Sequence, residues 1–224
     1  MTDTIALSDL AIAAYCPRKL HYARQDDRSP PESAEQARRL SRSYPDLRIA
    51  SDVALSSIGL DVSPSAFRES LDRVRETLDA WDALVAPAET DVFVRGKDAH
   101  GRLAKVLDDP LAPVLVSPGR PPETGVWHPQ SVRAVGSAKA LSWRESTPVE
   151  TAFVEYPFHG VVRKITLTTR RTAEYRRTLR AVRALDGPPP RLHDESRCGA
   201  CEYAEQCGVQ TRSLRSLLSL SGGR

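Results

Sequence analysis

Four cysteines at opposite ends of the chain place the strongest constraint on the fold. Cys198, Cys201 and Cys207 lie close together in "CGACEYAEQC", with C-x2-C-x5-C spacing, and Cys16 is the only other cysteine in the chain. A group bound by all four would close the long loop that runs from Cys16 to Cys198. Such a closure removes roughly 5 kcal/mol of chain entropy from the unfolded state. The sequence therefore predicts that residues 1–30 and 193–210 meet in one module.

The spacing of these cysteines favours a metal centre over disulfides. Three thiols this close, in a chain without an export signal, are typical of metal ligands because the cytosol keeps structural thiols reduced. Four thiolates suit a [4Fe–4S] cluster and also a structural zinc ion. Zinc sites usually show two close pairs, whereas one remote ligand with a group of three is common for iron–sulfur. We expect [4Fe–4S], with zinc as the alternative.

Composition predicts a folded domain outside the membrane. The chain has 224 residues, of which 40% are hydrophobic and 27% are charged, enough for one domain with a substantial core. Its apolar runs fall short of a membrane span, and the N-terminus "MTDTIALSDL" lacks the basic start of a signal peptide. We therefore expect a cytoplasmic protein that does not bind membranes.

The order of the predicted elements indicates an α+β fold, similar to an α/β sandwich, in a single domain 1–224. Apolar spacing predicts helices in "ALSDLAIAAYC", capped by Ser8, from Pro17 onward, and over 32–43, 64–85, 129–143 and 170–185. The runs "TDVFVRG", "GRLAKVLDD" and "APVLVSPG" predict consecutive antiparallel strands, followed later by "ETAFVEYP" and "GVVRKITLTT". The segment 32–86 is thus a helical insertion before a strand-rich core at 90–187.

A basic run follows the last predicted strand pair. The net charge is only +3, yet the segment from residue 163 to residue 183 carries a single acid, Glu174. Its cations are Arg163, Lys164, Arg170, Arg171, Arg176, Arg177, Arg180 and Arg183. A solvated helix face is the ordinary explanation for such a run, and a nucleic-acid-binding surface is the functional one.

Several of these features together resemble a known family. "YCPRKL" after an N-terminal helix, a strand-rich middle followed by a helix with Gln130, and the C-x2-C-x5-C tail are similar to the CRISPR-associated RecB-like exonucleases of the PD-(D/E)XK superfamily. The resemblance covers nearly the whole chain. It implies a RecB-like nuclease core with flanking helices and a [4Fe–4S] cluster on the four cysteines. It also implies single-stranded or forked DNA as the substrate, a role in CRISPR adaptation or DNA repair, and CRISPR adaptation proteins as candidate partners.

The nuclease motif of that family is degenerate in this chain. The resemblance places Ala104 of "GRLAKV" at the family's Asp, and Leu115 and Ser117 of "PVLVSPG" at its Glu and Lys. Gly119 keeps the turn glycine and Gln130 the helix glutamine. Metal-dependent phosphodiester cleavage requires carboxylates for Mg²⁺ or Mn²⁺ and a nearby positive charge. We therefore expect Mg²⁺ or Mn²⁺ only if the chain cleaves DNA by other residues.

Relocated carboxylates are the alternative for catalysis. Asp98 precedes the strand that carries Ala104, and Asp109 follows it, so both are candidates. Lys105 is expected on the opposite face of the strand from Ala104 and does not replace the missing lysine.

Three functions remain open from the sequence. The leading expectation is a DNA-binding protein with lost or reduced nuclease activity. The second is an active Mg²⁺- or Mn²⁺-dependent single-strand exonuclease that uses relocated carboxylates. The third is a scaffold or redox-sensing subunit that docks a partner protein, for which Leu214, Leu217 and Leu218 offer an apolar stripe.

Overall fold

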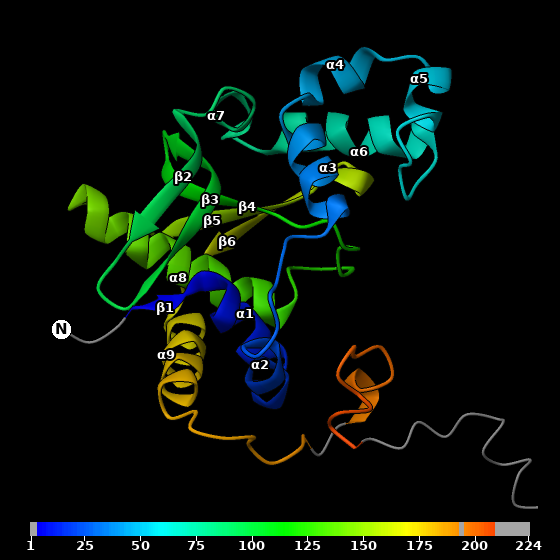
Figure 1. Cartoon of the computed structure of the whole chain (residues 1–224). Helices are drawn as coiled ribbons and strands as arrows, with labels where there is room; N and C mark the ends of the chain where they lie inside the picture. Colours follow the sequence, from blue (N-terminus) through cyan, green and yellow to red (C-terminus); the bar gives the residue numbers. More distant parts are fainter. Residues whose placement is uncertain (1–3, 193–194, 209–224) are drawn as a thin grey trace, which may run out of the picture.

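The computed structural model describes residues 4–192 and 195–208 and confirms the α+β fold (Figure 1). Helices cover both faces of a six-stranded sheet. The leucine stripe at 214, 217 and 218 lies outside the described residues, as do the ends of the two segments expected to form the cysteine module. Within the described ranges, no helix is both long and apolar enough to cross a bilayer.

The sheet combines an antiparallel meander with one parallel connection. Its strands are β1 (Ile5–Ala6), β2 (Glu89–Arg95), β3 (Ala99–Asp108), β4 (Leu111–Val116), β5 (Thr151–Tyr156) and β6 (Val161–Thr166). As the sequence predicts, β2, β3 and β4 pair antiparallel in chain order, and so do β5 and β6. The helix α8 (His128–Glu145) connects β4 to β5, which pair in parallel.

The sheet opens along one edge of β3. On the other edge β2 pairs with β3 from His100 to Leu103 and again at Lys105 and Val106, with a gap at Ala104 opposite Asp91. On the open edge β1 pairs only with Ala99 and His100, whereas β4 pairs from Lys105 onward. Residues 101–104 therefore have no strand neighbour on that side, and the sheet forks between β1 and β4. This fork positions the first candidate site.

The helices α1 (Leu7–Tyr15) and α8 pack on one face of the sheet, and α9 (Thr169–Arg183) packs against both of them. The helix α2 (Pro17–Ala23) follows α1 directly, and Pro17 starts it as the sequence predicts. Leu10 of α1, Val135 of α8 and Tyr175 of α9 share one buried core with residues of β2 and β3. Burying these side chains holds the three helices against the fork.

The helices that follow α2 cover the opposite face (Figure 1). They are α3 (Glu32–Ser41), α4 (Tyr44–Ile49), α5 (Asp52–Ser56), α6 (Pro64–Thr77) and α7 (Trp81–Val85). Their core contains Tyr44 and Phe67, packed with Leu107 of β3 and Phe153 of β5. The segment 32–86 is therefore helical, and its apolar side lies on the sheet.

Two helix boundaries differ from the sequence prediction. The first helix begins at Leu7 with Ala6 at its N-cap, so Ser8 lies inside the first turn and does not cap it. The helix predicted over 64–85 is broken, because Leu78 is extended (φ −102°, ψ 105°) and α7 begins a new helix at Trp81. The break lets Trp81 stack on Tyr44, with ring centroids 6.3 Å apart. The sequence patterns also missed β1, α4 and α5.

Candidate functional sites: a basic hollow and a four-cysteine pocket

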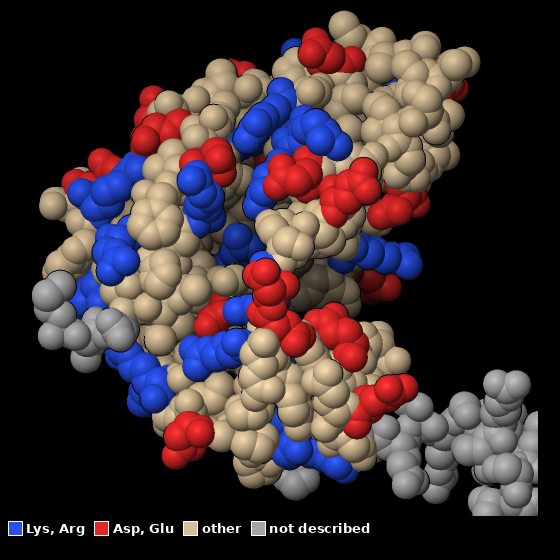
Figure 2. Space-filling model, viewed as in Figure 1, with Lys and Arg blue, Asp and Glu red and all other residues tan. Residues whose placement is uncertain are grey.

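A hollow of about 620 Å³ lies at the fork of the sheet. Ala104 of β3 and Leu115 of β4 both line it. Ala104 precedes Lys105 and Leu115 follows Val114, and Lys105 and Val114 are the last antiparallel pair at the fork end of these two strands. The two positions at which the resemblance expects carboxylates thus meet, but they carry a methyl and an isobutyl group. Figure 2 shows a recess near the centre of this face, with both basic and acidic side chains around it.

Ser117 and Gln130, the other two positions of the expected motif, also meet. Gln130 Nε2 donates to Ser117 Oγ at 2.8 Å. Gln130 Oε1 accepts from the backbone N–H of Trp127 at 3.2 Å and from the hydroxyl of Tyr156. Burial raises the pKa of Tyr156 to about 12. The group is an uncharged hydrogen-bond network that fixes the start of α8, and it supplies no positive charge in place of the missing lysine.

The two acids proposed as relocated carboxylates lie away from the hollow. Asp98 Oδ1 accepts from Arg183 of α9 at 2.8 Å, at the start of β3. Asp109 lies exposed in the turn between β3 and β4. Neither residue is among those that line the hollow.

The carboxylates that do line the hollow are Asp26 and Asp91. Asp26 Oδ2 accepts from the hydroxyl of Tyr203 at 2.7 Å. Asp91 Oδ2 lies 3.2 Å from the guanidinium of Arg102. Each is therefore engaged by a neighbour, and the sequence patterns did not indicate either one.

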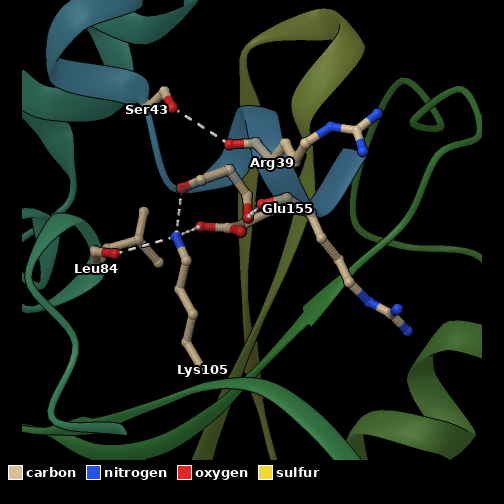
Figure 3. A network of polar contacts seen from close by, with 7 residues as sticks. Arg39, Ser43, Leu84, Lys105 and Glu155 are labelled. Atoms are coloured by element: carbon tan, nitrogen blue, oxygen red, sulfur yellow. Dashed lines mark hydrogen bonds and ion pairs between the residues drawn. The ribbon is translucent and has the colours of Figure 1, made fainter. Parts of the chain in front are cut away.

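Lys105 lies on the far side of β3 from the hollow, buried beneath the helical insertion (Figure 3). Its Nζ donates to the carbonyl oxygens of Ser41 at 2.6 Å and Leu84 at 3.1 Å, and lies 2.7 Å from Glu155 Oε1. Lys105 is 1% exposed and Glu155 is 0% exposed. Burial raises the pKa of Glu155, although the nearby ammonium opposes this shift. The ion pair stabilises the packing of the helical insertion on the sheet. Because the Lys105 side chain is held there, it does not lie beside Ala104.

Sequence patterns missed the basic lining of the hollow. Four arginines line it: Arg28, Arg38, Arg102 and Arg133. Two of them carry a signal in the sequence. Arg133 follows Gln130 by three residues and so shares its helix face, and Arg102 precedes Ala104 by two residues in the same strand.

The basic run forms part of the edge strand β6 and the helix α9. Tyr175, Leu179 and Val182 of α9 are buried, which leaves the arginine-rich side outward. Arg163 and Arg171 are partly buried and donate to the carbonyl oxygens of Glu123 at 3.1 Å and Thr166 at 2.8 Å. The exposed cations are Lys164, Arg170, Arg176, Arg177, Arg180 and Arg183. Of these, Arg170 pairs with Glu174 and Arg183 with Asp98, and the other four have no side-chain partner among the described residues.

All four cysteines line one small pocket of about 30 Å³ between the first two helices and the tail. The Tyr15 hydroxyl donates to the carbonyl of Arg197 at 2.7 Å, and the Arg197 guanidinium donates to the carbonyl of Tyr15 at 3.0 Å. The rings of Tyr22 and Tyr203 stack with centroids 6.0 Å apart. Protein contacts alone therefore bring the two ends of the chain together.

The chemistry of this pocket fits a thiophilic metal centre, although its geometry is not that of a formed site. The four cysteines form no disulfide, and within the described ranges no three potential ligands are placed to hold a metal ion together. Binding would require the sulfur atoms to draw closer around the metal. Lys19 and Arg197 line the same pocket and can offset the charge of thiolates. Burial, followed by the charge of Cys201, raises the pKa of Tyr15 at its edge.

Comparisons with known proteins do not identify a family for this chain. No protein-family model matches the chain, and no curated protein matches it. Among solved structures, one titled "Crystal structure of SSO0001" matches with a TM-score of 0.44 and 14% sequence identity. The match covers 94% of this chain and 89% of that one. A likeness at this level carries no argument about function.

Proposed function

We propose that the protein is a cytoplasmic, iron–sulfur DNA-binding member of the CRISPR-associated RecB-like exonuclease family. In this proposal it acts in CRISPR adaptation or DNA repair and has lost its nuclease activity. The observation that carries the proposal is the meeting of Ala104 and Leu115 in one hollow at the fork of the sheet. Ser117 and Gln130 meet as well, 2.8 Å apart. These are the proximities that the resemblance requires of its four motif positions.

The side chains at these positions support binding without cleavage. Mg²⁺ and Mn²⁺ are held by oxygen ligands, and neither a methyl nor an isobutyl group can provide one. A hydrolytic site also needs positive charge near the reacting phosphate, and Ser117 provides none. The shape of the site is retained while its metal ligands are absent.

The exposed cations of β6 and α9 support DNA binding. Lys164, Arg176, Arg177 and Arg180 are exposed and have no carboxylate partner within the described part of the chain. Cations that contact phosphates release counterions from DNA, so affinity falls as salt rises. A solvated surface with no DNA partner would show no such dependence.

The test of DNA binding is a salt titration with single-stranded, forked and duplex DNA. Each phosphate neutralised contributes about 0.7 to 0.9 to the slope of log K against log salt. We expect the triple variant Arg176→Gln/Arg177→Gln/Arg180→Gln to lower this slope by about 2. The control Arg42→Gln/Arg73→Gln/Arg75→Gln removes the same charge from exposed arginines of the helical insertion and should leave the slope unchanged. An equal decrease of the slope in the two triple variants, or an affinity that does not change with salt, would contradict the proposal.

A nuclease assay tests the loss of catalysis. Anaerobically purified protein with Mg²⁺ or Mn²⁺ should leave all three DNA forms intact. Cleavage that disappears in Asp26→Ala or Asp91→Ala would establish the exonuclease instead, because these two carboxylates line the hollow. Cleavage that depends on Asp98 or Asp109 would revive the relocated site outside it.

The four-cysteine pocket supports the [4Fe–4S] assignment. Cys16 comes from the end of α1 and the other three cysteines from the tail, yet all four line one space. Purified protein should absorb near 400 nm and contain about four iron atoms per chain. Cys16→Ala and Cys207→Ala should lose iron and solubility together, because binding free energy at such a site is also folding free energy. One zinc ion and no iron would identify the zinc alternative.

A further inference from the structure

The charges that line the hollow are unevenly paired. Three of its four arginines already have carboxylate partners: Arg28 with Asp9 at 2.9 Å, Arg102 with Asp91 at 3.2 Å, and Arg38 with Glu35 on the surface of α3. Arg133 of α8 makes no hydrogen bond or ion pair within the described ranges, and its Nε is fully enclosed. The hollow therefore holds one guanidinium without a counterion.

An arrangement of this kind costs the fold free energy. A buried polar group without a partner is destabilising, and a buried charge more so. Burial and the positive charge of Arg38 both lower the pKa of Arg133. Two guanidinium groups thus face the same space and repel each other when the hollow contains only water. An anion between them would relieve both costs.

The form of the hollow narrows the choice of anion. Its volume of about 620 Å³ is within the range of small-molecule sites and exceeds what a bare ion needs. Leu115, Val116 and Ile12 give it an apolar wall, and Ser8 and Ser29 also line it. Guanidinium groups bind phosphate through paired, charge-assisted hydrogen bonds. A phosphate group with an organic substituent matches these features.

We propose that the hollow is a phosphate-binding pocket in which Arg133 and Arg38 hold a phosphate group carried by a nucleic-acid strand or a free nucleotide. For the strand, the inference rests on the proposed function. If the ligand is a free nucleotide, the inference does not depend on DNA binding by α9. Because Ala104 and Leu115 border the same space, the phosphate is held and not hydrolysed.

The test compares phosphate ligands at constant ionic strength. Thermal shift and calorimetry with inorganic phosphate and deoxythymidine monophosphate measure the pocket itself. Matched oligonucleotides with a 5′-phosphate or a 5′-hydroxyl measure the strand. Tighter binding of the 5′-phosphorylated oligonucleotide than of its 5′-hydroxyl match identifies a strand end, and equal binding of these two, with binding of the mononucleotide, identifies the nucleotide.

Variants of Arg133 separate binding from structure. Arg133→Gln should weaken phosphate affinity by about 10- to 100-fold, the range for a lost charge-assisted hydrogen bond. In the absence of phosphate its melting temperature should stay the same or rise, because the unpaired charge has gone. A purely structural arginine would lower it. The control Arg73→Gln removes an exposed arginine of α6 and should change neither quantity.

The results of these experiments distinguish the phosphate-binding pocket from the proposed DNA-binding function. Unchanged phosphate affinity in Arg133→Gln, with a lower melting temperature, overturns the inference. If that variant fails to fold, Arg38→Gln, whose side chain is 31% exposed, gives the same readout, and unchanged affinity there overturns it too. Phosphate binding that depends on Arg133 in a protein that binds no DNA refutes the proposed function and supports the pocket. DNA binding that depends on α9, with no Arg133-dependent binding of phosphate or mononucleotide, supports the proposed function and refutes the pocket.

Discussion

Replacing Lys105 by methionine should destabilise the fold by about 3–5 kcal/mol, the range for breaking a buried ion pair. The ammonium makes three contacts, with the carbonyls of Ser41 and Leu84 and with Glu155 Oε1, all between 2.6 and 3.1 Å. Methionine keeps the length of the side chain and makes none of these contacts. Glu155 would be left as a buried carboxylate, and its Oε2 already has no hydrogen-bond partner.

A double-mutant cycle isolates the ion pair. Glu155→Leu should cost less than Lys105→Met, because the ammonium keeps both carbonyl partners and lies 5.3 Å from the ring centroid of Tyr44. The double variant Lys105→Met/Glu155→Leu removes both charges, and its free energy of unfolding should lie within about 2 kcal/mol of the wild-type value. The remaining cost is that of leaving the carbonyls of Ser41 and Leu84 without a donor. Urea unfolding followed by circular dichroism measures each free energy. Additive costs, or a cost under about 1 kcal/mol for Lys105→Met, would refute the reasoning.

The pH dependence of Lys105→Met gives a second check. Burial raises the pKa of Glu155 above its ordinary 4.5, and the Lys105 ammonium is the main influence in the opposite direction. Without the ammonium, the folded-state pKa rises further, so the folded protein binds more protons than the unfolded chain above pH 4.5. Its stability must then increase as pH falls toward 4.5. The variant should be less destabilised at pH 5 than at pH 7, and the opposite trend would exclude a buried carboxylate as the cause.

Three further predictions concern other parts of the fold. Gly160→Ala should lower the melting temperature, because residue 160 has φ +62° and an added Cβ would lie 2.9 Å from a backbone oxygen of α6. Burial lowers the pKa of His159 below its ordinary 6.5, with Asp61 opposing, so stability should fall as pH drops below 6.5. That decline should shrink in His159→Gln. Tyr203→Phe removes the hydrogen bond to Asp26 and should increase proteolysis of the cysteine-rich tail.

Local pattern predicted most elements of the fold because each has its own hydrophobic period and boundary residues. The meander β2–β3–β4 follows from short apolar runs separated by Gly, Asp and Pro. The break after Thr77 did not follow, because the apolar spacing continues through Leu78 and Trp81 in sequence. Stacking of Trp81 on Tyr44, a contact between distant segments, accompanies a new helix there. Such a contact has no signature in a local window.

The hollow was only partly predictable from the sequence. The resemblance placed Ala104 and Leu115, which both line the hollow at the fork. Lys105 lies away from the hollow as expected, although β3 does not keep strict alternation, since Leu103 and Val106 share one core and Leu107 lies in the other. Arg28 and Arg38 could not be placed, since they come from segments before and within the helical insertion. Their arrival at the fork depends on how α3 packs on the sheet.

Arg102 and Arg133, unlike Arg28 and Arg38, lie at short spacings from motif positions in the sequence. Arg102 precedes Ala104 by two residues, and Arg133 follows Gln130 by three. Both Arg102 and Ala104 line the hollow. Arg133 lies one helical turn after Gln130 and faces the same side. A fork without carboxylates at positions 104 and 115, but with the unpaired Arg133 beside them, is suited to hold a phosphate. The charge of Arg133 on α8, more than the absence of carboxylates at positions 104 and 115, therefore distinguishes a phosphate-binding pocket from a site that has only lost its activity.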